Sequence, residues 1–257
     1  MRFFRSLVRA AQLLGYFMRY GSELLIKRPS TREGRADWLH RFAASALEGL
    51  GVKVDVSGSF PEHGALISNH LSYLDIIVFA SLQPCVFVSK IEVASYPVLG
   101  WMTTMAGTVY VARGHGGSAV KAREGMRAAL NAGLPVVFFP EGTTSNGSGL
   151  LKFHGGLLAQ VLAENAPVTA GHLCYHMDQD NGDATVSDDI CYWGDDVQLL
   201  PHIFNLLGLN GIRAQVRFAE EPVVFTSTSD QRKRAAQEAW IAVGELAERS
   251  TERVPTA

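Results

Sequence analysis

The chain has 257 residues, of which 47% are hydrophobic and 19% charged, and its formal net charge is −2 at pH 7. This apolar content argues against a disordered chain, and the small negative charge argues against a strongly basic nucleic-acid-binding protein. The three cysteines are widely spaced, which argues against a disulfide framework or a CxxC zinc site and fits a reducing compartment.

The start of the chain is basic: residues 1–40 hold eight Lys or Arg against three Asp or Glu. In the first 26 residues apolar side chains fall at helical spacing, but the longest uncharged stretch has nine residues, too short for a membrane span or a secretory signal. We predict that residues 1–40 form a helical segment at the membrane interface, with a basic amphipathic helix whose arginines meet anionic headgroups. The alternative is an ordinary helix that packs on the domain.

A second apolar stretch, residues 93–112, has no charged side chain over 20 positions. It contains Pro97, Gly100 and Gly107, and its end reads as a strand at 108–111. We predict a buried or interfacial helix followed by a core strand, with a membrane span as the alternative.

Along the rest of the chain, short apolar runs alternate with helical patterns. Strands are predicted at 65–68, 85–89, 108–111, 135–139, 168–175 and 212–218, and helices at 72–81, 118–131, 155–164 and 229–249. This alternation predicts an α/β fold with a mostly parallel central sheet flanked by helices. We divide the chain into the basic segment 1–40, a main domain over 41–225, and a C-terminal surface helix and tail over 226–257.

The motif Asn-His-Leu-Ser-Tyr-Leu-Asp at 69–75 follows the first of these strands directly. His70 would stand at the carboxyl end of the strand, where a histidine can act as a general base near neutral pH. Asp75, in the first turn of the next helix, could orient the imidazole and stabilise its protonated form. The alternative is that Asn69 or Ser72 caps the helix and His70 is a turn residue.

Further polar side chains follow the other strands. Glu141, Gly142 and Thr143 come after the strand at 135–139, where the glycine allows close backbone approach and the hydroxyl and N–H groups could bind phosphate or ester oxygens. Lys90 and Arg113 end two more strands and could bind a phosphate. Each of these residues could also be a solvated turn residue. Because the carboxyl ends of parallel strands share one edge of a sheet, we expect them to meet there.

The elements NHLSYLD, GTVYVAR and FPEGTTS, in this order, make residues 60–175 resemble the glycerophospholipid acyltransferase family, which includes 1-acylglycerol-3-phosphate acyltransferases. The resemblance implies acyl transfer from acyl-CoA or acyl-carrier protein to the hydroxyl of a lysophospholipid, first of all 1-acylglycerol-3-phosphate. It implies His70 as base, Asp75 as its partner, Arg113 as phosphate ligand, and Glu141, Gly142 and Thr143 in the acceptor site. No metal or further cofactor is expected, and the enzyme would work at the cytoplasmic face of a membrane, as a peripheral or monotopic protein.

Two departures from the family pattern keep the acceptor open. Thr144 stands where the family often has arginine, and residues 166–171 keep only the first half of the family's fourth motif. A headgroup-bearing lysophospholipid or a lyso-amino-acid lipid is therefore the alternative acceptor. A lipid hydrolase would need a G-x-S-x-G elbow, which the chain lacks. A non-catalytic lipid-binding membrane protein is the remaining alternative, but it leaves His70, Asp75 and Glu141 without a task.

Overall fold

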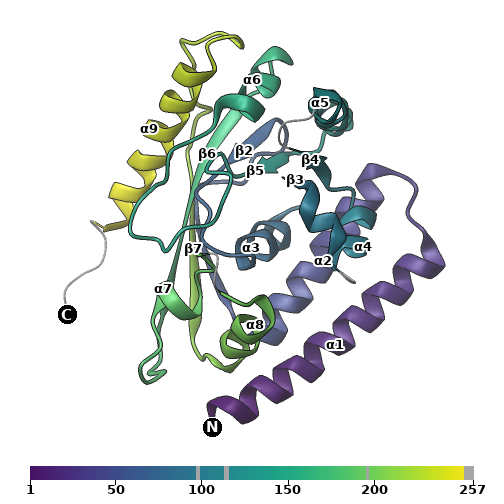
Figure 1. The fold of residues 1–257 in the computed structure, drawn as a ribbon, viewed down its shortest axis with the longest axis vertical. Coiled ribbons are helices and arrows are strands. Elements are labelled where there is room, and N and C mark those ends of the chain that lie inside the picture. Colours follow the sequence, from purple (N-terminus) through teal and green to yellow (C-terminus); the bar gives the residue numbers. More distant parts are fainter. Residues whose placement is uncertain (97–98, 113–115, 195–196, 252–257) are drawn as a thin grey trace.

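A seven-stranded sheet forms the centre of the molecule, in a computed structural model that describes residues 1–96, 99–112, 116–194 and 197–251 (Figure 1). The order of the strands across the sheet is β1-β7-β6-β2-β5-β3-β4. The strands are β1 (Lys53–Ser57), β2 (Ala65–Ile67), β3 (Val86–Lys90), β4 (Val109–Val111), β5 (Val136–Phe138), β6 (Val168–Met177) and β7 (Ile212–Phe218).

Strands β6, β2, β5, β3 and β4 run in one direction, while β7 pairs antiparallel with β6, and β1 runs parallel to β7. The predicted mostly parallel α/β sheet is therefore confirmed. Strand β2 is covered on both faces and all three of its side chains are buried, which explains its unbroken apolar run. Strand β1 was missed because it is a short, largely exposed edge strand in which charged and apolar residues alternate.

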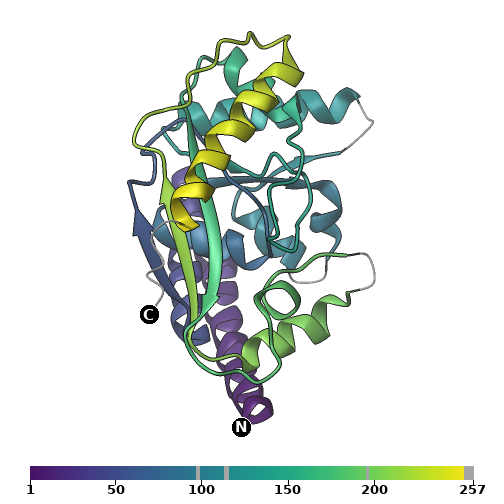
Figure 2. The ribbon, with the colours of Figure 1, turned by 90° about the vertical axis from the view of Figure 1, so that its left-hand side faces the viewer.

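Helices cover both faces of the sheet (Figures 1 and 2). On one face, α2, α3 and α8 enclose a core that includes Leu66, Phe79 and Leu173. On the other face, α5, α6 and α9 enclose a core that includes Met126 and Phe138. The helical elements are α1 (Arg2–Lys27), α2 (Arg32–Leu50), α3 (Leu74–Leu82), η1 (Ile91–Ser95), α4 (Leu99–Met105), α5 (Gly116–Asn131), α6 (Gly155–Ala163), α7 (Val186–Asp189), α8 (Leu199–Gly208) and α9 (Arg232–Thr251).

Helix α1 lies along α2 and α8 at the edge of the molecule (Figure 1). Arg5 donates to the carbonyl oxygen of Gly208 at 2.8 Å, and Arg9 donates to the carbonyl oxygens of Leu207, at 3.2 Å, and Leu209. The last carbonyls of a helix have no partner within the helix and carry partial negative charge, so they favour cationic donors. These two arginines, expected among lipid headgroups, instead hold α1 against the end of α8.

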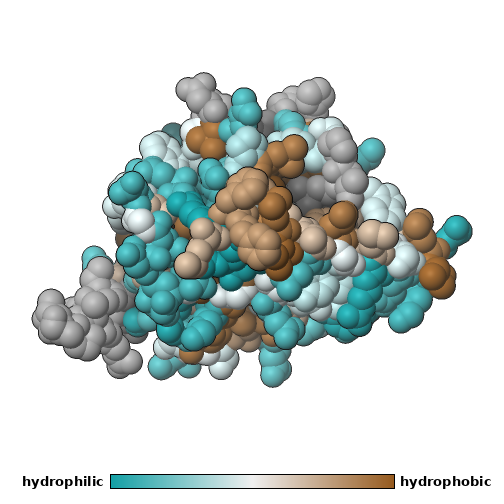
Figure 3. All heavy atoms as spheres, turned by 90° about the horizontal axis from the view of Figure 1, so that it is seen from below, coloured by the Kyte–Doolittle hydropathy of each residue, from teal (hydrophilic) through white to brown (hydrophobic). Residues whose placement is uncertain are grey.

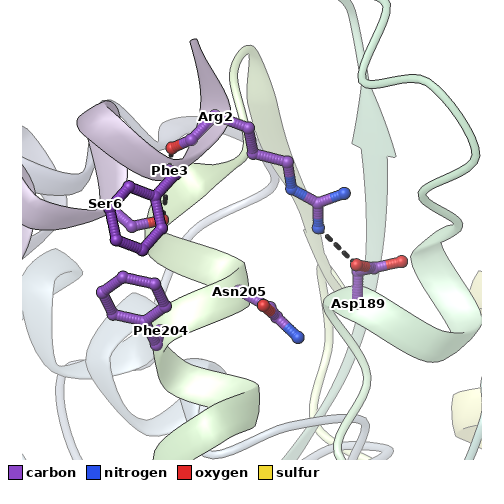
Figure 4. A pocket seen from close by; sticks show the side chains of 6 residues that line it. All are labelled: Arg2, Phe3, Ser6, Asp189, Phe204 and Asn205. Carbon is purple, nitrogen blue, oxygen red and sulfur yellow. Dashed lines mark hydrogen bonds and ion pairs between the residues drawn. The ribbon is translucent and has the colours of Figure 1, made fainter.

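The N-terminal end of α1 adds two contacts, shown in Figure 4. The Arg2 guanidinium pairs with the Asp189 carboxylate of α7, and the Phe3 ring meets the Phe204 ring of α8 edge to face, with centroids 5.6 Å apart. An open cavity of about 310 Å³ lies between these side chains, together with Ser6 and Asn205. Helix α1 is thus fixed at this end by polar and aromatic contacts.

The second apolar stretch of the sequence forms several short elements rather than one long helix. Residues 93–112 contain the end of η1, the short helix α4 and strand β4, as the predicted helix and strand require. None of the helices described here has the length and apolarity needed to cross a bilayer. Helix α2 runs across residue 40, the position at which we divided the basic segment from the main domain. It begins after its N-cap Thr31, whose side chain accepts from Gly34 N–H at 3.1 Å.

Candidate active site

His70 follows β2 at the carboxyl end of the parallel strands, as predicted. Its ring nitrogen Nδ1 lies 2.7 Å from Asp75 Oδ2, and its ring stacks on Phe139 with centroids 3.9 Å apart and planes 5° apart. The other ring nitrogen, Nε2, has no hydrogen-bond partner among the described residues, and 17% of the side chain is exposed. Since Asp75 accepts at Nδ1, the Nδ1–H tautomer is favoured and Nε2 is left as the proton acceptor.

The Asp75 carboxylate is fully buried in the first turn of α3 and has hydrogen bonds on both oxygens. Besides the His70 ring, Oδ2 accepts from the backbone N–H groups of Leu71 at 2.7 Å and Ser72 at 3.0 Å. Oδ1 accepts from the Tyr175 hydroxyl at 2.7 Å. Burying a carboxylate is costly unless hydrogen-bond donors replace the lost water, and this network supplies such donors.

The FPEGTTS turn, residues 139–145, binds both the N–H and the carbonyl group of His70. Its N–H donates to Glu141 Oε2 at 3.2 Å, and its carbonyl oxygen accepts from Ser145 N–H at 2.9 Å. The other Glu141 oxygen accepts from Leu151 N–H at 3.1 Å. Glu141 is buried, with only 2% of the residue exposed. Both of its oxygens therefore bind the protein's own backbone, which ties the position of His70 to this turn.

Burial raises the pKa of Glu141 to about 7, although the hydrogen bonds from Leu151 and His70 act in the opposite direction. The folded protein thus retains a proton on Glu141 between the ordinary value of 4.5 and about 7, whereas the unfolded chain loses it. The stability due to this group is fully present below pH 4.5 and is lost as the pH rises through about 7.

We expect Glu141→Gln to remove this pH dependence, because glutamine cannot titrate. Between pH 4.5 and 8 the free energy of unfolding of the wild type should fall relative to that of the variant by on the order of 3 kcal/mol. Urea unfolding of both proteins at four pH values measures the difference. A difference that stays constant with pH would contradict the raised pKa.

The remaining predicted residues lie around this centre. Gly142 has φ 67°, a left-handed conformation that favours glycine, and its N–H donates to Phe139 O at 3.1 Å within the turn. Thr143 is exposed beside it. Lys90 is exposed at the end of β3, which β5 separates from β2, roughly 10 Å across the sheet. Arg113 lies outside the described residues.

Two residues of the site carry roles that the sequence did not indicate. Asn69 does not cap a helix: its side chain accepts from Leu173 N–H and donates to Leu173 O, both at 2.8 Å. These bonds tie the loop between β2 and α3, which carries His70 and is called the histidine loop below, to β6. Tyr175, two residues further along β6, reaches Asp75. Neither contact has a local sequence signal, because each joins residues about 100 positions apart in the chain.

The chain is similar to a family model and to several known proteins. The acyltransferase family model matches residues 52–170. The chain is 36% identical over 171 residues to the lyso-ornithine lipid O-acyltransferase of Pseudomonas aeruginosa, covering 66% of this chain and 62%, less than two thirds, of that protein. It is 33% identical over 177 residues to the 1-acyl-sn-glycerol-3-phosphate acyltransferase of Neisseria meningitidis, covering 68% of this chain and 69% of that protein.

A solved structure extends the comparison of the fold to nearly the whole chain. The crystal structure of the 1-acyl-sn-glycerophosphate acyltransferase PlsC of Thermotoga maritima matches with a TM-score of 0.64, covering 96% of this chain and 98% of that one. The sequence identity is 20%, so this likeness concerns the fold alone. The family model and the relatives, together with the histidine and aspartate at the end of β2, show that the chain belongs to the acyltransferase family.

Proposed function

We propose that this chain transfers a fatty acyl group from a thioester, acyl-CoA or acyl-carrier protein, to the free hydroxyl of a lysolipid. The observation that carries the proposal is the His70–Asp75 pair, in which Asp75 accepts at Nδ1 and Nε2 is left to accept a proton. The named acyltransferases among the relatives support the same reaction class.

In the proposed reaction, His70 Nε2 removes the proton from the acceptor hydroxyl as the oxygen attacks the thioester carbonyl. Asp75 stabilises the imidazolium. When the tetrahedral intermediate collapses, the carbon–sulfur bond breaks, the thiolate takes the proton back from His70, and an ester and a thiol are released. The oxyanion would be stabilised by a backbone N–H of the turn near Gly142, such as that of Thr143; the Ser145–His70 hydrogen bond holds this turn beside the imidazole.

We propose 1-acylglycerol-3-phosphate as the first candidate acceptor, with Lys90 and Arg113 binding its phosphate. Glu141 would position His70 through the hydrogen bond to its backbone N–H. The relative from Neisseria meningitidis is named for this acceptor. Lyso-ornithine lipid is the second candidate. It is favoured by Thr144, which replaces an arginine that could bind phosphate, and by the name of the Pseudomonas aeruginosa relative.

An acceptor panel distinguishes the two candidates. Purified protein receives one acyl-CoA or acyl-carrier protein together with lysophosphatidic acid, lyso-ornithine lipid, or a headgroup-bearing lysophospholipid, and the acylated lipids are measured by mass spectrometry. The proposal predicts a product with one of these acceptors. Products from none of them, with either donor, would contradict it.

We further propose that α1 binds the membrane surface through an apolar stripe, so that the enzyme is peripheral or monotopic at the cytoplasmic face. The exposed apolar side chains of α1 recur at helical spacing on the side away from its contacts with α8; they are Phe4, Leu7, Val8, Leu14, Met18, Leu25 and Ile26. Figure 3 views the molecule from the end that carries the N-terminus and shows apolar side chains gathered in the middle of that face. A helix with such a stripe is suited to lie in the bilayer interface.

Replacing Leu7, Leu14 and Met18 together by serine is expected to lower liposome binding about 100-fold, since a buried apolar side chain contributes about 1.5–3 kcal/mol and interfacial burial is partial. Flotation with liposomes of stated composition measures it. The matched control is the triple variant Val56→Ser, Val224→Ser and Ile241→Ser, whose side chains are also exposed but lie outside α1. Equal binding by both variants would contradict a membrane role for the stripe.

A further inference from the structure

The two oxygens of the Asp75 carboxylate depend on different parts of the molecule. Oδ2 is held by donors from its own loop: the His70 ring and the backbone N–H groups of Leu71 and Ser72. Among the described residues, Oδ1 accepts one hydrogen bond, from the hydroxyl of Tyr175 at 2.7 Å. One hydroxyl group thus supplies the hydrogen bond at this end of a carboxylate that has no access to water.

We infer that Tyr175 is a positioning residue of the reaction, which fixes Asp75 and thereby sets how readily His70 takes a proton. The inference rests on the proposed function of the His70–Asp75 pair. Tyr175 lies outside the motifs that identify the family and outside the residues 52–170 that match the family model.

The architecture of β6 explains why a tyrosine reaches this point. Strand β6 pairs with β2 only over its first residues and then continues as a ribbon with β7 alone. The side chains of Leu173 and Tyr175, which are two positions apart, lie on the same face of this ribbon, toward α3. The backbone of Leu173 holds Asn69, and the Tyr175 side chain holds Asp75. Asn69 near the start of the histidine loop and Asp75 just after its end are thus both hydrogen-bonded to strand β6.

The environment keeps Tyr175 a donor. Only 4% of the residue is exposed, and its strand partner is the small residue Ala214, which leaves room for the ring. Burial and the neighbouring Asp75 raise the pKa of Tyr175 well above its ordinary value, so the hydroxyl keeps its proton at any pH used for assay. A hydrogen bond to a charged acceptor is about twice as strong as a neutral one.

Removing this donor should have a defined chemical effect. Without the Tyr175 hydroxyl, the negative charge of Asp75 is less delocalised by hydrogen bonding and attracts the proton on the imidazolium more strongly. We expect Tyr175→Phe to move the acidic limb of the kcat/KM profile upward by about 0.5–1 pH unit. We also expect it to lower kcat about tenfold, because Asp75 orients the imidazole less well. KM should remain unchanged, because Tyr175 is buried and its hydroxyl bonds to Asp75.

Other titratable groups near the pair must be separated from this effect. Burial holds the pKa of Cys191 at about 12 and raises that of Tyr73, so both stay neutral. Glu141, whose pKa is about 7, titrates in the same range. The comparison is therefore repeated in the Glu141→Gln background, where the shift caused by Tyr175→Phe should persist.

Tyr20→Phe is the matched control, since it also removes a buried tyrosine hydroxyl, one bonded to Ser45 at 2.8 Å between α1 and α2. Both variants should lose thermal stability, but only Tyr175→Phe should change kcat and the pH profile. Replacing Tyr175 by 3-fluorotyrosine, a stronger donor of nearly the same shape, should move the acidic limb the opposite way. Tyr175→Phe with an altered melting temperature but an unchanged profile and kcat would overturn the inference.

An NMR titration of the His70 ring nitrogens, assigned by comparison with His70→Ala, makes the test independent of turnover. Its midpoint should rise in Tyr175→Phe and fall with 3-fluorotyrosine. If the wild type transfers no acyl group, the proposed function fails while the titration still decides the role of Tyr175. If the midpoints are equal in all three proteins, the inference fails whatever the activity.

Discussion

His70→Ala is expected to lower kcat/KM for acyl transfer by about 10²–10⁴-fold, the usual contribution of a positioned general base. The loss should be in kcat rather than in KM, because Nε2 acts on the hydroxyl proton only as the new bond forms. The fold should survive, since the His70 side chain is held by one hydrogen bond and by stacking on Phe139.

His63→Ala is the matched control for this experiment. His63 is an exposed histidine that precedes β2, at the opposite end of the strand from His70. The same change of side chain there should leave kcat/KM and the melting temperature near wild-type values. A His70→Ala protein that is folded and turns over at the rate of the control would remove His70 from the mechanism.

Asp75→Asn is expected to have the second largest effect, a loss of about 10²–10⁴-fold in kcat. The asparagine oxygen can still accept from the His70 ring and from the two backbone N–H groups, and the Tyr175 hydroxyl can rotate to accept from the new amide. The geometry should therefore be retained, but the negative charge that stabilises the imidazolium is gone.

The same variant should also lose stability, because the four hydrogen bonds of the carboxylate lose their charged partner. We expect the free energy of unfolding to fall by about 1–3 kcal/mol. Asp37→Asn is the control: this aspartate is 56% exposed on α2 and bonds to Arg41 four residues on, so little change is expected. An Asp75→Asn protein with wild-type kcat would show that the carboxylate charge has no part in the reaction.

The sequence predicted strands β2, β3, β4 and β5 well because each is a short apolar run between turn signals. The strand predicted at 212–218 coincides with β7, and the one at 168–175 ends two residues before β6 does. Strand β1 carried no such signal: its side chains alternate between lysine, valine and aspartate, and nothing covers most of them. The position of His70 followed from the end of β2, because the turn after a parallel strand must lie at that edge of the sheet.

The contacts that support the site could not be predicted in the same way. Tyr175 and Asp75 are 100 positions apart, and only the pairing of β6 beside β2 brings them together. Glu141 was predicted in the acceptor site, and the sequence did not indicate that its oxygens bind the backbone N–H groups of His70 and Leu151. A lone carboxylate in a turn has the same sequence signature in both roles.

The orientation of α1 likewise depends on the tertiary structure. Apolar residues lie on two sides of this helix: Tyr20 and Leu24 are buried against the protein, while the apolar stripe is exposed. On the side that faces the protein, the carbonyl groups at the C-terminal end of α8 also bind Arg5 and Arg9. The spacing in the sequence gives the two sides but not which of them faces the domain.

The central claim is a direct transfer in which His70 acts on the acceptor hydroxyl. The most direct measurement follows thiol release from an acyl thioester and formation of the acylated lipid in one reaction, with and without the lysolipid acceptor, for wild type and His70→Ala. The account predicts equal amounts of thiol and acylated lipid, both dependent on the acceptor and on His70. Thiol released at the same rate without an acceptor, or a wild type that releases none with either donor, would contradict it.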